Sequence, residues 1–115
     1  MKNILTVKDI ERSLQSKKEH LEAFYILVQK QDELMQKLDM AGLMDNLSSR
    51  QRHIRDVERL EEKMPDRRLL LSNSSCARLS VEINDVIRSI QVLDTQNQQK
   101  VRDRLVFLKG NATGM

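Results

Sequence analysis

Residues 6–38 read TVKDIERSLQSKKEHLEAFYILVQKQDELMQKL, and this stretch decides the fold class. Apolar side chains recur in it every three or four residues, the spacing that places them on one face of an α-helix. These positions are Ile10, Leu14, Leu21, Phe24, Val28, Met35 and Leu38. The rhythm is complete if Lys17 and Gln31 fill the two missing positions of the seam. Thr6 followed by Asp9 suits a helix start, so the stretch predicts one long amphipathic helix.

A second helical segment lies between two breaks in the sequence. Residues 39–42, which end in Gly42, interrupt the first pattern as a tight bend or a kink. Pro65 stops the next pattern, because proline lacks the backbone N–H and disfavours helical geometry in the residue before it. Between the breaks, apolar residues keep helical spacing at Leu43, Leu47, Ile54, Val57, Leu60 and Met64. The leucines at 69–71 suggest a short extra helix near residues 66–71 that caps the open end of the bundle.

A third helical segment fills most of the C-terminal part of the chain. Ser74 or Ser75 suits its N-cap, and Gly110 suits the position just after its end. Its apolar positions are Leu79, Ile83, Val86, Ile87, Ile90, Leu93, Val101, Leu105 and Leu108. Residues 110–115 are expected to form a frayed tail. Three helices joined by short breaks predict an all-α fold, an antiparallel bundle in a single domain spanning residues 1–115.

The composition excludes several other classes of protein. The 115 residues are 39% hydrophobic and 3% aromatic, with three glycines and one proline, which argues against a β-sandwich or barrel. The chain has no glycine-rich loop for a nucleotide phosphate. A single cysteine cannot build a disulfide framework, and the first residues lack the apolar core of a signal peptide. Apolar runs are too short to span a membrane, so we expect a cytoplasmic protein without membrane insertion.

Residues that could carry chemistry are few and scattered. His20 and His53 have no cysteine near them in sequence, so they do not match a known metal-ligand spacing. Cys76 could act as a nucleophile with His53 only if the fold brings the two together, and packing is the commoner role of such a cysteine. We therefore expect no enzyme activity, no cofactor and no metal site.

The net charge of +3 is confined to the C-terminal part of the chain. Residues 66–115 carry eight Lys or Arg and five Asp or Glu, whereas the two charge types balance in the rest. The residues of the third helix that could form a basic stripe are Arg88, Lys100, Arg102, Arg104 and Lys109. Because a nucleic-acid binder usually shows a denser basic stripe, nucleic-acid binding is the less favoured interpretation.

The third segment is the best candidate for a partner-binding helix, because its apolar positions are too widely spread for one narrow seam. Val86, Ile90, Leu93, Asn97 and Val101 follow a 4-3-4-4 spacing and so share one helix face. This face could receive an amphipathic helix of another protein. The same pattern also fits an ordinary core or the seam of a homodimer.

Three stretches carry a family resemblance: residues 36–39 at the end of the first helix, 47–54 in the second and 87–100 in the third. Together they resemble the FlgN/FliT group, small cytosolic flagellar export chaperones of the type III secretion system. The resemblance is one of pattern and extends over the whole chain. It implies a non-enzymatic chaperone that binds aggregation-prone terminal amphipathic helices of flagellar subunits and delivers them to the export apparatus, with the cargo on the third helix.

Two other functions stay open from the sequence. One is a homo-oligomeric coiled-coil adaptor, in which the polar seam residues Lys17, Gln31 and Asn97 would set the register. The other is a small nucleic-acid-associated regulator that uses the basic residues of the third helix.

Overall fold

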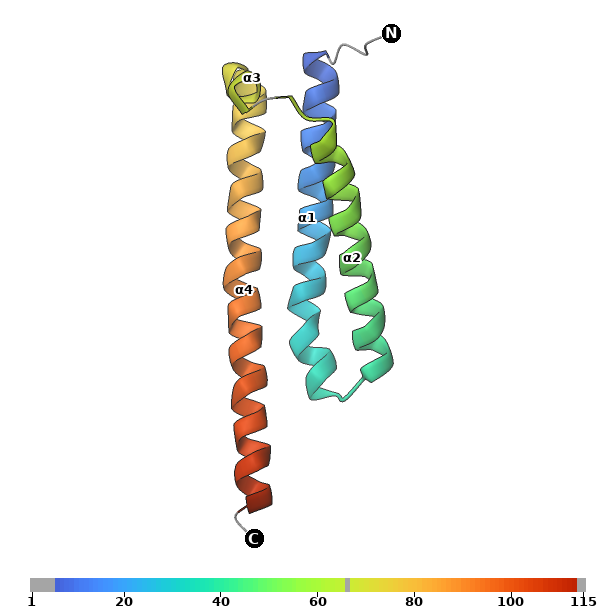
Figure 1. Cartoon of the computed structure of the whole chain (residues 1–115), viewed down its shortest axis with the longest axis vertical. Helices are drawn as coiled ribbons and strands as arrows, with labels where there is room; N and C mark the ends of the chain where they lie inside the picture. The colour runs from blue at the N-terminus through green and yellow to red at the C-terminus, as the bar shows by residue number, and fades with distance from the viewer. Residues whose placement is uncertain (1–5, 66, 114–115) are drawn as a thin grey trace.

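The computed structural model describes residues 6–65 and 67–113, and these residues form four α-helices and no strand (Figure 1). The helices are α1 (Val7–Gln36), α2 (Met40–Glu62), α3 (Arg67–Ser72) and α4 (Ser74–Thr113). The predicted all-α bundle of three main helices is confirmed. The short α3 lies where the leucine triplet predicts an extra helix.

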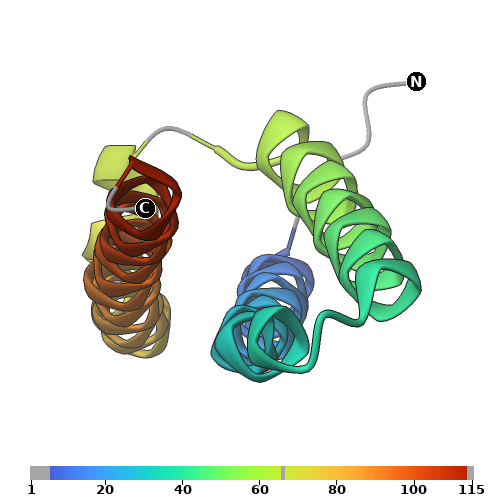
Figure 2. The ribbon, with the colours of Figure 1, turned by 90° about the horizontal axis from the view of Figure 1, so that it is seen from below.

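Helix α1 lies in the middle of the bundle. It packs along α2 on one side and along α4 on the other, while α3 packs against the start of α4 (Figure 1, Figure 2). Helices α1 and α4 run in the same direction and α2 runs opposite to both, so consecutive long helices are antiparallel. The molecule is elongated and measures 70 × 24 × 18 Å along its principal axes.

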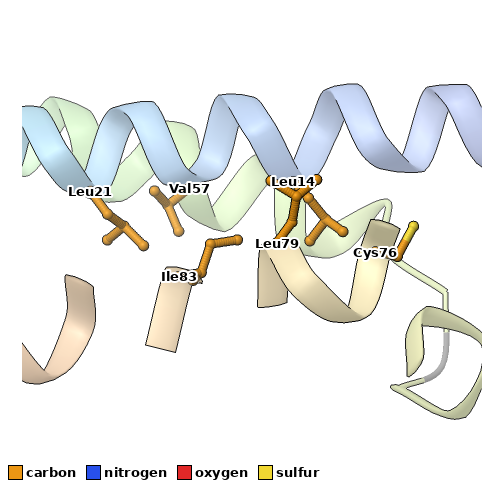
Figure 3. Close-up of a cluster of buried hydrophobic side chains, with 6 residues drawn as sticks. All are labelled: Leu14, Leu21, Val57, Cys76, Leu79 and Ile83. Atoms are coloured by element: carbon orange, nitrogen blue, oxygen red, sulfur yellow. The ribbon is translucent and has the colours of Figure 1, made fainter. Parts of the chain in front are cut away.

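The hydrophobic core lies in the half of the bundle nearest α3. Its six buried side chains come from α1, α2 and α4 (Figure 3): Leu14, Leu21, Val57, Cys76, Leu79 and Ile83. Leu14 and Leu21 are seven residues apart on α1, and Val28, seven residues further on, has no exposed surface. This spacing keeps one face of the helix turned inward. The apolar pattern of residues 6–38 therefore predicts the inner face of α1 correctly except at Leu38, which lies beyond the end of the helix and is 77% exposed.

The two polar residues predicted in the seam of α1 lie between the helices. Lys17 Nζ forms an ion pair with Glu61 Oε1 of α2 at 3.0 Å, although the Lys17 side chain is only 18% exposed. The Arg50 guanidinium of α2 donates a hydrogen bond to Gln31 Oε1 at 2.7 Å. Long polar side chains can occupy a seam in this way because their stems pack while their ends find partners.

The start of α1 is a capping box, as the sequence predicts. The Asp9 backbone N–H donates to the Thr6 hydroxyl at 3.2 Å, and the Thr6 backbone N–H donates to the Asp9 carboxylate at 3.1 Å. These bonds satisfy two backbone donors that a helix otherwise leaves without partners.

The turn between α1 and α2 is tighter and earlier than the sequence predicts. Leu38 has a φ of 55°, in the left-handed region, and its N–H donates to the Met35 carbonyl at 3.1 Å. The Asp39 N–H donates to the Leu34 carbonyl at 2.9 Å, which completes the hydrogen-bond pattern of a Schellman motif. Gly42 is already helical, and Asp39 caps α2 by accepting from its N–H. A Cβ at Gly42 would collide with the Asp39 side chain, which explains the glycine.

Both predicted ends of the third helix are corrected by the structure. The cap of α4 is Asn73, whose Oδ1 accepts from the N–H groups of Ser75 and Cys76, rather than Ser74 or Ser75. Helix α4 continues through Gly110 to Thr113, so Gly110 does not end it. A glycine with nothing packed around its Cβ position weakens a helix but does not stop it. Residues 114 and 115, the end of the predicted tail, lie outside the described residues.

Candidate partner-binding surface

The five residues predicted to bind a partner share one face of α4, and that face is turned toward α1. Val86 and Ile90 pack against the hydrophobic core, and Leu93 and Val101 are half-buried. Asn97 is 3% exposed, and its Nδ2 donates to the Val28 carbonyl of α1 at 3.0 Å. The structure therefore brings the five residues together, with α1 packed against the face they share.

A polar layer crosses the middle of the bundle at the level of Val28. Asn46 of α2 donates from Nδ2 to the Leu27 carbonyl at 2.8 Å, beside the bond that Asn97 makes to the next carbonyl of α1. Arg50 of α2 lies over the Phe24 ring and 3.8 Å from the Asp94 carboxylate of α4. These directional contacts fix the register of α2 and α4 on α1.

Ion pairs along the edge of α4 connect it to α1 at two levels. Lys18 Nζ lies 3.0 Å from Glu82 Oε2 beside the hydrophobic core, and Lys100 Nζ lies 3.4 Å from Asp32 Oδ2 near the end of α1. Both pairs are partly exposed, so they add little stability and mainly align the helices. Beyond Lys100, α4 runs past the turn that joins α1 and α2 (Figure 1).

We call residues 101–113 of α4 the α4 tip. Three consecutive apolar side chains on it are largely exposed: Leu105 at 60%, Val106 at 70% and Phe107 at 64%. Consecutive residues of a helix point in different directions, so the tip is apolar on more than one side. A helix that is apolar around much of its circumference is usually covered by other protein. The tip is therefore the most prominent apolar surface on α4.

A shallow hollow of about 440 Å³ lies between the tip and the end of α1. Asp103, Arg104 and Phe107 of α4 line it together with Gln36 of α1, and the ion pair of Lys100 with Asp32 closes one side. The hollow combines an aromatic ring with charged and amide groups, the composition of many small protein-recognition sites.

The residues considered for catalysis and metal binding lie in two different surroundings. Cys76 is 1% exposed, and burial, with a smaller contribution from the Glu11 carboxylate, raises the pKa of its thiol. His53 faces His20 across α1 and α2, with the two Nδ1 atoms 3.0 Å apart. In the described part of the chain, no three His, Cys, Asp or Glu side chains are grouped so that they could hold a metal ion.

Two further findings concern membrane-spanning helices and similarity to known proteins. Among the described residues, no helix is both long and apolar enough to cross a membrane. Comparisons with protein-family models, curated proteins and solved structures find no match for this chain. The choice between functions therefore depends on the residues and their geometry.

Apolar spacing in the sequence does not predict two features of the bundle, the polar inner face of α2 and the exposure of the α4 tip. The inner face of α2 carries Asn46, Arg50 and His53, and polar residues give no signal in a search for apolar periodicity. The exposure of the α4 tip depends on the length of α4 relative to α1 and α2. The signal available in the sequence is the run Leu105–Leu108, in which apolar residues occupy four successive positions of a helix.

Proposed function

We propose that this chain is a non-enzymatic binding module that takes up an amphipathic helical segment of a protein partner on the α4 tip. The observation that carries the proposal is the exposure of Leu105, Val106 and Phe107 where α4 extends past the other helices. A partner helix that lies along the tip would bury these side chains in the way that α1 buries the earlier part of α4.

The class of partner follows from the resemblance to the FlgN/FliT export chaperones. Such a chaperone covers a terminal segment of a secreted flagellar subunit in the cytoplasm and hands it to the export apparatus. A segment that orders only on binding loses conformational entropy, which keeps the affinity moderate and permits release. A binding tip at one end of a rigid bundle suits a task that requires both capture and release.

The proposed surface adjoins the predicted one instead of coinciding with it. Val101 is the first residue of the tip, whereas Val86, Ile90 and Asn97 lie against α1 in the single chain. Asn97 is 3% exposed, so a partner can reach it only by displacing α1, whereas Val86 and Ile90 are half-buried and offer only part of their surface. Binding at the tip requires no such displacement.

A titration with labelled peptides tests the proposal. The probes are fluorescent synthetic peptides of the terminal segments of the host's hook-associated and filament-cap subunits, followed by fluorescence anisotropy. We expect one of them to bind the intact protein, and Phe107→Ser to weaken it at least about tenfold, since exposed aromatic anchors dominate small interfaces. The matched control is Ile26→Ser on α1, which removes a side chain of similar exposure, 54%, away from the tip.

Other results would contradict the proposal. Binding that Phe107→Ser leaves unchanged would remove the tip as the surface, and failure of every peptide to bind would remove the chaperone function. Sedimentation that shows only a tight oligomer, without peptide binding, would favour the coiled-coil adaptor. Lys17, Gln31 and Asn97 give that alternative no support, because all three find partners within the chain.

A further inference from the structure

Arg104 is a half-buried cation at the edge of the hollow described above. It makes no ion pair with any of the described residues, although it lines the hollow beside Phe107. The neighbouring charges are already engaged: Lys100 pairs with Asp32, and Asp103 Oδ1 accepts from Gln99 at 2.8 Å. A partly desolvated guanidinium favours a carboxylate, which it can bind through two parallel hydrogen bonds.

Most of the charges around the tip have the same sign as Arg104. Residues 100–109 carry four Lys or Arg and one Asp. Arg102, Leu105 and Lys109 follow a 3-4 spacing, so a cation lies on either side of an exposed apolar side chain on one helix face. An apolar patch with a basic border is complementary to a helix whose apolar stripe has an acidic border.

From these contacts we infer that the segment bound by the α4 tip is an acidic amphipathic helix, with one carboxylate in the hollow against Arg104 and apolar side chains over Phe107. The inference rests on the function proposed above and adds the chemistry of the partner. Nucleic acid is a poorer fit, because three exposed apolar side chains lie among only a few cations. An anionic lipid surface shares the negative charge, and the test below distinguishes it from a peptide.

Two synthetic helical peptides of about 20 residues test the inference, a length of about 30 Å that exceeds the tip. They share one leucine pattern and differ only in the border of the stripe, which is Glu in one and Lys in the other. We expect the Glu peptide to bind the full chain at least about tenfold more tightly, with an advantage that shrinks as salt rises from about 0.05 M to about 0.5 M. Arg104→Gln should remove most of this preference, and Arg104→Lys only part of it.

The control variant is Arg88→Gln, which removes an exposed arginine of α4 outside the tip and should leave the preference unchanged. Circular dichroism on each variant verifies that the helices are intact. Equal binding of the two peptides, or a preference that survives Arg104→Gln, would overturn the inference and leave the function standing. If neither these peptides nor the subunit peptides bind, the proposed function itself fails. Binding only to duplex DNA or to phosphatidylglycerol vesicles would overturn both.

Discussion

At the scale of single residues, Leu38 adopts a strained left-handed backbone conformation that the turn between α1 and α2 requires. A non-glycine residue with φ near 55° brings its Cβ too close to the following carbonyl oxygen. Leu38 is also 77% exposed, so its side chain gains little from packing. The Schellman hydrogen bonds hold the backbone in this conformation, because both donors of the motif are satisfied at the end of α1.

Replacement of Leu38 by glycine should therefore stabilise the protein. Removal of the strain is worth about 1–2 kcal/mol, and the greater entropy of glycine in the unfolded chain offsets about half of it, so we expect a net gain of about 0.5–1 kcal/mol. Urea unfolding followed by circular dichroism measures the change. Leu38→Ala is the control, because it removes the exposed side chain but keeps the Cβ, and it should leave the stability nearly unchanged. If the glycine variant is less stable than the alanine variant, the claim that the backbone is strained at Leu38 is wrong.

At the scale of elements, the helix starts are fixed by side chains that bond to the backbone. Thr6 caps α1, Asp39 caps α2 and Asn73 caps α4. In each cap a side-chain oxygen accepts a hydrogen bond from a backbone N–H. We expect the first of these starts to depend on pH. Hydrogen bonds from the Thr6 hydroxyl and backbone N–H lower the pKa of Asp9 below its ordinary value.

The start of α1 should therefore loosen in acid. A carboxyl group whose pKa is lower in the folded state stabilises that state at neutral pH, and this contribution is lost as the pH falls below about 4 and through the folded pKa. We expect amide protection of Thr6, Asp9 and Ile10, whose N–H groups donate within this cap, to fall between about pH 5 and pH 2, measured by NMR hydrogen exchange after correction for the intrinsic rate. In Asp9→Asn the protection should already be low and change little with pH. An equally steep fall in that variant would show that another group is responsible.

The helices themselves follow from the sequence more closely than their contacts do. Repeated apolar residues seven positions apart predict the inward face of α1, and Lys17 and Gln31 fill the positions assigned to them. The turn does not follow, because nothing in the sequence shows that Leu38 accepts a left-handed conformation while Gly42 stays helical. Local propensity favours the glycine as the break, and the cap from Asp39 overrides it.

The predicted partner-binding residues of α4 show the same point: the sequence predicts which residues share a helix face but not what that face contacts. Helical spacing alone shows that Val86, Ile90 and Asn97 share a face, and they do. Whether that face meets α1 or a partner depends on which helices overlap along the bundle, a property of the three-dimensional arrangement. Val106 and Phe107, which are not among the regularly spaced apolar positions of the third segment, are exposed, but Leu105, which is one of those positions, is exposed as well.

At the scale of the whole molecule, the type of contact between the helices changes along the length of the bundle. The hydrophobic core joins α1, α2 and α4 near α3, the polar layer fixes the register in the middle, and the α4 tip carries exposed apolar residues at the other end (Figure 1). The core is formed by residues that precede the tip, so we expect a partner bound as proposed above to leave the core intact.

Hydrogen–deuterium exchange on the full chain, with and without the subunit peptide that binds best, tests this account most directly. If the α4 tip is the binding surface, amides of residues 101–113 should exchange more slowly when the peptide is present. Amides of the core segments of α1 and α4, around Leu14 and Leu79, should keep their rates, because the peptide does not contact them. The account is contradicted if the tip exchanges at the same rate with and without the peptide while protection appears in α2, or if α1 and α4 lose protection because the peptide separates them.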